Sequence, residues 1–116
     1  YQPELVTVCL GQNDGVQDSV AFCTAYVDFI EDIRSQYPKA YILCLSSPMA
    51  DPVLNEVLQS YLPAVVQEVH RTGDEQVGYF FFSKQYTGGC DSHPNLEDHA
   101  LIAGELTAYL KRQLGW

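Results

Sequence analysis

The stretch Leu-Val-Thr-Val-Cys-Leu-Gly-Gln-Asn-Asp, residues 5–14, decides the fold class of this chain. Its first six residues form a near-continuous apolar run that ends at a glycine, which is typical of a strand buried on both faces of a sheet. Two later apolar runs, AYILCL and VGYFFF, have the same character. We therefore predict three strands, at Leu5–Leu10, Ala40–Leu45 and Val77–Phe82.

Two amphipathic patterns with helical spacing lie between these strands. The first covers residues 23–37, can be capped by Asp18 or Ser19, and is stopped by the proline that follows it. The second covers residues 54–69, and Pro63 within it should either kink the helix or begin a new one. Both patterns predict helices that pack an apolar face on the sheet.

The last helical pattern is the clearest of the three. Asn95 can cap it, Lys111 and Arg112 suit its last turn, and Gly115 closes it. Its expected buried stripe consists of apolar residues at helical spacing: Leu96, Ala100, Ala103, Leu106 and Leu110.

Strands and helices thus alternate along the whole chain, which predicts parallel strands joined by right-handed crossovers. We therefore expect an α/β fold with a parallel sheet of about three strands between helical layers, in which residues 1–116 form one domain or part of one. Ligands of such sheets gather at the carboxyl ends of the strands. The segments after the first and last strands, Gly11–Asp14 and Asp91–Pro94, should therefore lie at one edge.

Composition excludes several classes of function. Charged residues make up 18% of the chain and its net charge is -9, which leaves no basic patch for nucleic acid or anionic lipid. No apolar run approaches the roughly 20 residues that a membrane-spanning helix needs. The four cysteines form no CxxC pair, and Cys9 and Cys44, inside apolar runs, are expected as buried thiols. Nothing in the sequence calls for a cofactor, and the cellular compartment stays open.

Asp91-Ser92-His93-Pro94 carries the residue types of a general base. A histidine takes a proton near neutral pH when a neighbouring group holds its tautomer and stabilises the imidazolium. In an extended segment, side chains at positions i and i+2 point the same way, so Asp91 could orient His93. A polar turn that leads into a helix explains the same four residues.

Gly11-Gln12-Asn13-Asp14 carries a second candidate. The Asn13 side-chain amide, two residues after a strand-ending glycine, could donate to a developing oxyanion. Alternatively, Asn13 and Asp14 are turn residues whose side chains bond to the backbone.

A metal site would be a competing use of the second motif, because Cys90, Asp91, His93 and His99 are all ligand types. Their spacing matches no common structural zinc pattern, and we assign no metal.

The order strand, GxND, helix, strand, helix, strand, DxHP, helix resembles the C-terminal portion of the SGNH hydrolases, also called GDSL-type esterases and lipases. The Asp-x-His spacing of Asp91 and His93 and the stretch from Asn95 to Trp116 look most like carbohydrate esterase family 2. Members of that family remove acetyl groups from plant polysaccharides such as xylan. The resemblance therefore implies an SGNH-type fold and a carboxylic ester hydrolase that is secreted or extracytoplasmic.

Carried over by position, the resemblance implies that Asn13 donates to the oxyanion, His93 is the base and Asp91 orients it, with Gly11 and Asp14 in support. The nucleophilic serine of the family lies in a Gly-Asp-Ser block that precedes GxND, and only ten residues precede it here. No resident serine has the glycine-flanked turn of a nucleophile. We expect the nucleophile upstream of this chain, whose 116 residues alone should be inactive.

Two other functions compete with this hypothesis. The chain could be a non-catalytic carbohydrate-binding α/β module, whereas a receiver-like signalling domain is disfavoured because no strand ends in a phosphate-accepting aspartate with a lysine partner. Without the upstream strands of the full fold, the strand at Leu5–Leu10 would be an unprotected sheet edge that is apolar on both sides, which invites pairing with a second copy or poor solubility. We therefore expect a homodimer through this edge, and acetylated carbohydrate or another small ester as the ligand.

Overall fold

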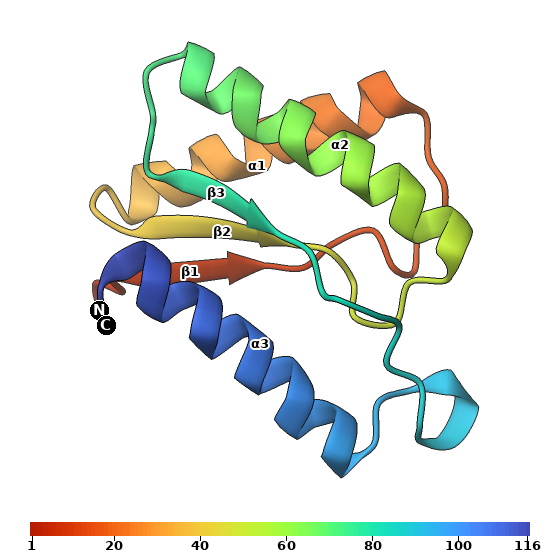
Figure 1. Ribbon diagram of the computed structural model, residues 1–116. Coiled ribbons are helices and arrows are strands. Elements are labelled where there is room, and N and C mark those ends of the chain that lie inside the picture. The colour runs from red at the N-terminus through yellow and green to blue at the C-terminus, as the bar shows by residue number, and fades with distance from the viewer.

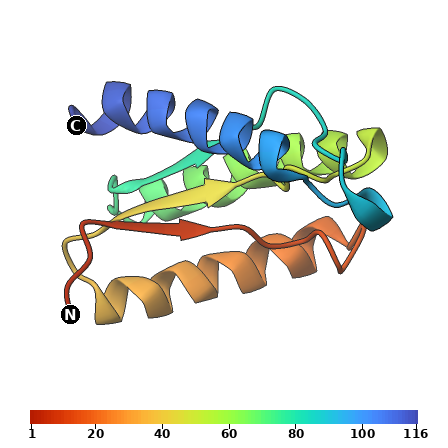
Figure 2. The same cartoon turned by 90° about the horizontal axis from the view of Figure 1, so that it is seen from below.

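The computed structural model describes residues 1–116 as a three-stranded parallel sheet between two layers of helices (Figure 1). The sheet order is β1-β2-β3. Helices α1 and α2 cover one face and α3 covers the other, as Figures 1 and 2 show from two sides. The predicted α/β fold with a parallel sheet is confirmed. Its elements in chain order are β1 (Leu5–Val8), α1 (Ser19–Gln36), β2 (Tyr41–Leu45), α2 (Pro52–Arg71), β3 (Val77–Phe80), the short 3₁₀ turn η1 (Cys90–Ser92) and α3 (Leu96–Leu114).

The strand β1 differs from its prediction in length and in burial. It pairs with β2 only from Leu5 opposite Tyr41 to Val8 opposite Cys44, so the two residues after Val8 leave the sheet. Cys9 is exposed, and the expectation of a buried thiol there was wrong, whereas Cys44 is fully buried. Because β1 is the edge strand, it is only partly covered, and its backbone is unpaired on one side.

The core consists of two apolar layers that share β2. Ile42 and Cys44 point toward α1 and α2, and Leu43 and Leu45 point toward α3, as the alternation along a strand requires. All four side chains are buried. Burial also raises the pKa of the Cys44 thiol to about 12, although a hydrogen bond with Tyr26 opposes the shift, so this cysteine acts as a small apolar residue.

The ends of the helices follow from their capping residues. Asp18, rather than Ser19, caps α1 by accepting the Ala21 N–H at 2.9 Å. α2 begins with Asp51 as its cap and continues through Pro63 as one helix, so Pro63 does not begin a new helix.

The third helix, α3, has the predicted ends but a different buried face. Asn95 and Asp98 form a reciprocal capping box, and Gly115 closes the helix at φ 71°. However, Leu96 is 89% exposed, and no residue of α3 is fully buried. The residues that pack on the sheet are Ile102, Leu106, Tyr109 and Leu110. The predicted stripe was therefore correct at Leu106 and Leu110 but wrong at Leu96, Ala100 and Ala103, because the helix turns the larger apolar side chains of Ile102 and Tyr109 to the sheet instead.

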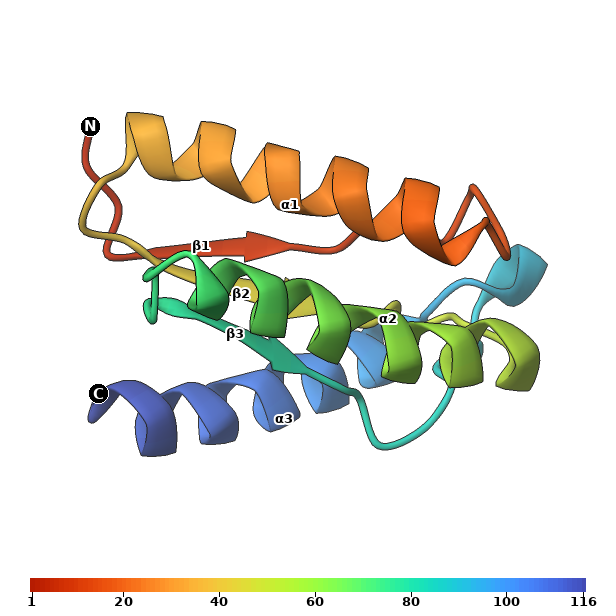
Figure 3. The ribbon, with the colours of Figure 1, turned by 90° about the horizontal axis from the view of Figure 1, so that it is seen from above.

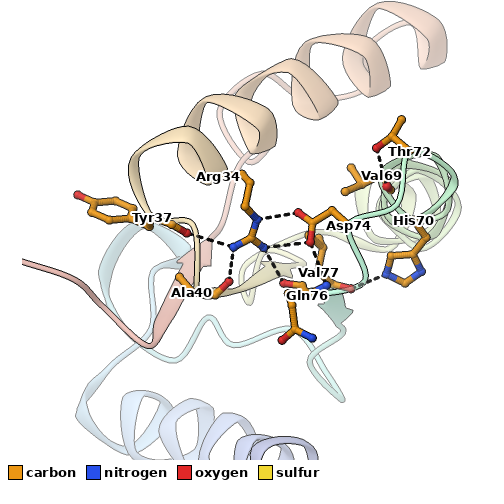
Figure 4. A network of polar contacts seen from close by, with 9 residues as sticks. All are labelled: Arg34, Tyr37, Ala40, Val69, His70, Thr72, Asp74, Gln76 and Val77. Carbon is orange, nitrogen blue, oxygen red and sulfur yellow. Dashed lines mark hydrogen bonds and ion pairs between the residues drawn. The ribbon is translucent and has the colours of Figure 1, made fainter.

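A polar network at the amino ends of the strands joins three elements (Figure 4). Arg34 Nε donates to Asp74 at 2.7 Å, and its Nη1 donates to the carbonyls of Tyr37 and Ala40 at 3.1 and 2.6 Å. Its Nη2 donates to the carbonyl of Gln76 at 3.1 Å. One guanidinium thus joins the end of α1 to the segments that lead into β2 and β3. This network lies at the amino ends of the strands, whereas the two sequence motifs lie at the carboxyl ends.

None of the helices has the length and apolar character needed to cross a membrane.

Candidate functional site

The two sequence motifs lie at the same edge of the sheet. The segment after β1 and the turn η1 both lie beyond the carboxyl ends of the strands, to which the arrowheads point in Figure 1. Figure 3 shows both segments at the same end when the molecule is seen from above. No hydrogen bond joins the motifs directly. The prediction that both motifs lie at the carboxyl ends of the strands is therefore confirmed. One motif follows β1 and the other follows β3.

Gly11 determines how the chain leaves β1. It is buried and has a φ of +102°, a conformation that side-chain-bearing residues rarely adopt. A Cβ atom at this position would lie 3.3 Å from both Leu58 and Phe22, so the turn packs tightly on α1 and α2. The glycine therefore serves to bring the following three residues to the edge of the sheet.

Asn13 and Asp14 are exposed, and neither side chain makes a hydrogen bond. The carbonyl of Asp14 accepts the side-chain amide of Gln17 at 2.5 Å. The side-chain-to-backbone bonds expected of a purely structural turn are therefore absent at both residues, and the amide of Asn13 can donate to a ligand. Between Gly11 and Asn13, the Oε1 atom of Gln12 is buried without a partner.

His93 is oriented by the backbone rather than by a carboxylate. Its Nδ1 lies 2.9 Å from the main-chain carbonyl of Asp91, and the Asp91 carboxylate makes no hydrogen bond. Because a carbonyl only accepts, Nδ1 must carry the proton, which leaves the lone pair on Nε2. The ring thus has the tautomer that a general base needs, and the side chain is exposed.

The expectation that Asp91 and His93 share an extended segment was wrong. Asp91 has φ 49° and ψ 40°, and Ser92 has φ 59°, so both occupy the left-handed region. This bend turns the carbonyl of Asp91, and not its carboxylate, toward the imidazole. A hydrogen bond of 2.7 Å from the Gly89 N–H to the His93 carbonyl, and one of 3.0 Å from the His93 N–H to the Cys90 carbonyl, close the turn.

Three serines near the carboxyl ends of β2 and β3 use their hydroxyls in local hydrogen bonds. Ser46 is fully buried, and its Oγ accepts the Phe82 N–H at 3.1 Å, while Ser47 Oγ accepts the Met49 N–H at the same distance. Ser83 donates to Glu105 at 2.7 Å. None of the serines donates a hydrogen bond to the His93 ring. The cysteines are all free, and the chain has no group of three or more His, Cys, Asp or Glu side chains that could hold a metal ion. His99 is exposed.

Glu105 is a polar anchor that the sequence did not indicate. Its carboxylate accepts the Ser83 N–H at 2.9 Å, the Ser83 hydroxyl and the Tyr86 hydroxyl, which fixes the loop after β3 to α3. Burial opposes ionisation, but these hydrogen bonds outweigh it and lower the pKa of Glu105 below its usual range. The hydrogen bond with Glu105 raises the pKa of Tyr86. Glu105 is next to Leu106 of the predicted apolar stripe, and a carboxylate near the sheet requires hydrogen-bond partners. This position is the feature of the sequence from which Glu105 could have been identified.

Comparisons with known proteins show what the chain as a whole is similar to. No family model matches the chain. Cellulase/esterase CelE of Acetivibrio thermocellus is 38% identical over all of this chain and 15% of its own length. An acetylxylan esterase / glucomannan deacetylase of Cellvibrio japonicus is 28% identical over all of this chain and 32% of its own length.

A solved structure agrees with the sequence relatives. A family two carbohydrate esterase from Clostridium thermocellum, determined in complex with cellohexaose, superimposes with a TM-score of 0.90 at 37% identity, covering all of this chain and 38% of the other. The α/β fold with its parallel sheet thus matches that of the SGNH-type carbohydrate esterases. Within that class, the homologues of this chain are carbohydrate esterase family 2 members, as the resemblance indicated. The chain spans about a sixth to a third of the curated relatives that it matches.

Proposed function

We propose that this chain forms the C-terminal part of a serine esterase that removes acetyl groups from carbohydrate. His93 is its general base, and Asn13 is one donor to the oxyanion. The observation that carries the proposal is the contact between His93 Nδ1 and the Asp91 carbonyl, which leaves a basic Nε2 exposed at the carboxyl edge of the sheet. The carbohydrate esterases among its homologues support the choice of substrate.

In this mechanism, His93 Nε2 takes the proton of a serine hydroxyl as the serine oxygen bonds to the acetyl carbon. The carbonyl oxygen becomes an oxyanion that the Asn13 amide stabilises. The imidazolium then gives its proton to the sugar oxygen as the ester bond breaks. In the second half of the reaction, His93 takes a proton from water as the water oxygen bonds to the acetyl carbon. It then gives this proton to the serine oxygen as the bond between serine and acetyl breaks, which releases acetate and the free serine.

Asp91 supports the base through its main chain in this proposal. Its carbonyl holds Nδ1–H and so fixes the ring, and the carboxylate is not required for orientation. Gly11 supports Asn13 by making the tight exit from β1, and Asp14 supports it by holding Gln17 through its carbonyl. Asp91→Asn should therefore reduce kcat less than His93→Ala does.

We place the nucleophilic serine outside residues 1–116. The purified 116 residues should then show no hydrolysis of p-nitrophenyl acetate above the background rate, while the longer protein that carries them should hydrolyse it. Turnover by the 116 residues that disappears in His93→Ala would refute this placement. Inactivity of the longer protein toward acetylated xylan would refute the esterase itself.

The exposed edge of β1 supports a further expectation for the 116 residues in isolation. Its unpaired backbone groups and the exposed Leu10 that follows the strand favour pairing with a second copy. Light scattering should therefore detect a dimer or larger species. A monodisperse monomer over a range of concentrations would contradict this expectation.

A non-catalytic carbohydrate-binding module is the second candidate, because a homologous esterase was solved with cellohexaose bound. Calorimetry with xylo-, manno- and cello-oligosaccharides distinguishes the two functions. Binding by the longer protein without hydrolysis of any acetylated form would favour the module.

A further inference from the structure

The loop that carries His93 is fastened at both of its ends to the first turn of α3. At one end, the Gly88 N–H donates to Asp98 Oδ2 at 2.7 Å, and the Gly88 carbonyl accepts Asn95 Nδ2 at 3.1 Å. At the other end, Asp98 Oδ2 accepts the Asn95 N–H at 3.2 Å, and Asn95 Oδ1 accepts the Asp98 N–H at 2.9 Å. His93 lies between these two fastened points, five residues after the first and two before the second.

These contacts exceed what a helix cap requires. A capping box needs only the two reciprocal bonds between the cap and the third helical residue. Here both polar side chains of the box also bind Gly88, which is ten residues before Asp98 in the sequence. The additional pair of bonds closes residues 88–95 into a ring on the end of the helix. We call these four bonds the loop lock.

The backbone inside the ring is in a conformation that needs such support. Asp91 and Ser92 both have positive φ, and each residue with a side chain in that region costs about 1–2 kcal/mol. Both residues are exposed, so packing does not hold them. The carbonyl of Asp91 contacts the imidazole only because of this bend. Loss of the loop lock would allow the segment to relax and would remove that contact.

The space around Gly88 shows how closely the loop packs against the side chains of Asn95 and Asp98. A Cβ atom on Gly88 would lie 2.7 Å from Asn95 Nδ2 and 2.8 Å from Asp98 Oδ2. By contrast, a Cβ atom on Gly104, farther along the same helix, would meet nothing within 4 Å. The two glycines thus provide a disrupting substitution and a matched control.

We propose that Asn95 and Asp98 are positioning residues for His93, and that the loop lock selects the imidazole tautomer in which Nδ1 is protonated. This role rests on the proposed function of His93 as the base. The two residues do not touch the reacting atoms. They act by holding residues 88–95 so that the Asp91 carbonyl reaches Nδ1.

The test uses the longer protein that carries this chain, in the wild-type form and as Gly88→Ala and Gly104→Ala. Gly88→Ala keeps both residues of the capping box, but its Cβ forces their side chains and the loop apart and so breaks the two bonds to Gly88. Because a displacement of about 1 Å can cost 10²-fold in rate, we expect kcat for an acetylated substrate to fall by about 10–100-fold with KM nearly unchanged. Gly104→Ala should retain the wild-type kcat.

A second pair of variants protects the test against a folding defect. Asp98→Asn keeps an oxygen that can accept the Gly88 N–H and should retain most of the wild-type kcat, whereas Asp98→Ala should lose it as Gly88→Ala does. If Gly88→Ala and Asp98→Ala lower the melting temperature but leave kcat unchanged at 25 °C, the loop lock is merely a helix cap and the proposal is overturned.

The spectroscopic readout does not depend on turnover. The ¹⁵N spectrum of the His93 ring should show protonated Nδ1 and unprotonated Nε2 in the wild type and a mixture of tautomers in Gly88→Ala. An unchanged tautomer in Gly88→Ala would overturn the proposal. If His93→Ala leaves esterase activity intact, the proposed function fails, and the tautomer comparison still decides whether the loop lock orients the ring.

Discussion

Replacing Arg34 with methionine should destabilise the protein without changing its chemistry. The arginine makes five hydrogen bonds, two to Asp74 and three to the carbonyls of Tyr37, Ala40 and Gln76 (Figure 4). Methionine can fill much of the same space but donates none of them. The carboxylate of Asp74 would keep only the Gln76 N–H as a donor.

The size of the effect follows from the exposure of the pair. A hydrogen bond to a charged group contributes about 1.5–3 kcal/mol when it is buried, and solvent weakens it. The side chains of Arg34 and Asp74 are 21% and 23% exposed, so water can replace part of what is lost. We therefore expect Arg34→Met to lower the free energy of unfolding by about 2–4 kcal/mol.

Urea denaturation of the longer protein, followed by circular dichroism, measures this loss. Arg34→Lys should recover less than half of it, because an ammonium cannot reach the carbonyls of two strands and the carboxylate at once. The kcat of both variants should match the wild type well below their melting temperatures, since the network lies at the opposite end of the sheet from His93. A loss below about 0.5 kcal/mol in Arg34→Met, within the range of ordinary surface substitutions, would refute the reasoning.

Three further predictions concern the carboxyl edge. Ser46→Ala leaves the Phe82 N–H buried without an acceptor, so thermal denaturation should show a loss of stability of about 1–3 kcal/mol. Its kcat should be unchanged, because Ser46 is not the nucleophile. Glu105→Gln should destabilise the fold most above about pH 5, where the Glu105 carboxylate is ionised; because folding lowers the pKa of Glu105, the wild-type advantage should be lost as the pH falls below this range, and a pH-independent difference in urea denaturation would contradict this. Asn13→Ala should reduce kcat of the longer protein by about 10²–10³ in acetate-release assays, and an unchanged kcat would remove it from the oxyanion site.

The parts of the fold set by local chemistry could be predicted from the sequence. The alternation of apolar runs and helical patterns predicts the three parallel strands, and capping side chains predict the helix ends, because each acts within one turn of the backbone that it binds. Placement of both motifs at one edge follows from the direction of parallel strands alone.

The features that depend on contacts between distant segments could not be predicted in this way. Glu105 of α3 is bound by Ser83 and Tyr86, which lie about twenty residues earlier in the chain. The orientation of His93 depends on positive φ at Asp91 and Ser92, and neither residue type requires that conformation. Side chains two residues apart face the same way only in extended backbone. This rule therefore failed at Asp91 and His93, where the backbone is bent inside the loop lock.

Labelling the longer protein with diethyl p-nitrophenyl phosphate tests the central claim most directly. This reagent phosphorylates an activated serine, and mass spectrometry of the peptides locates the adduct. We predict one adduct on a serine outside residues 1–116, formed about 10²–10⁴ times more slowly in His93→Ala because the base is absent. An adduct on a serine within residues 1–116, or a labelling rate that does not change in His93→Ala, would contradict the account.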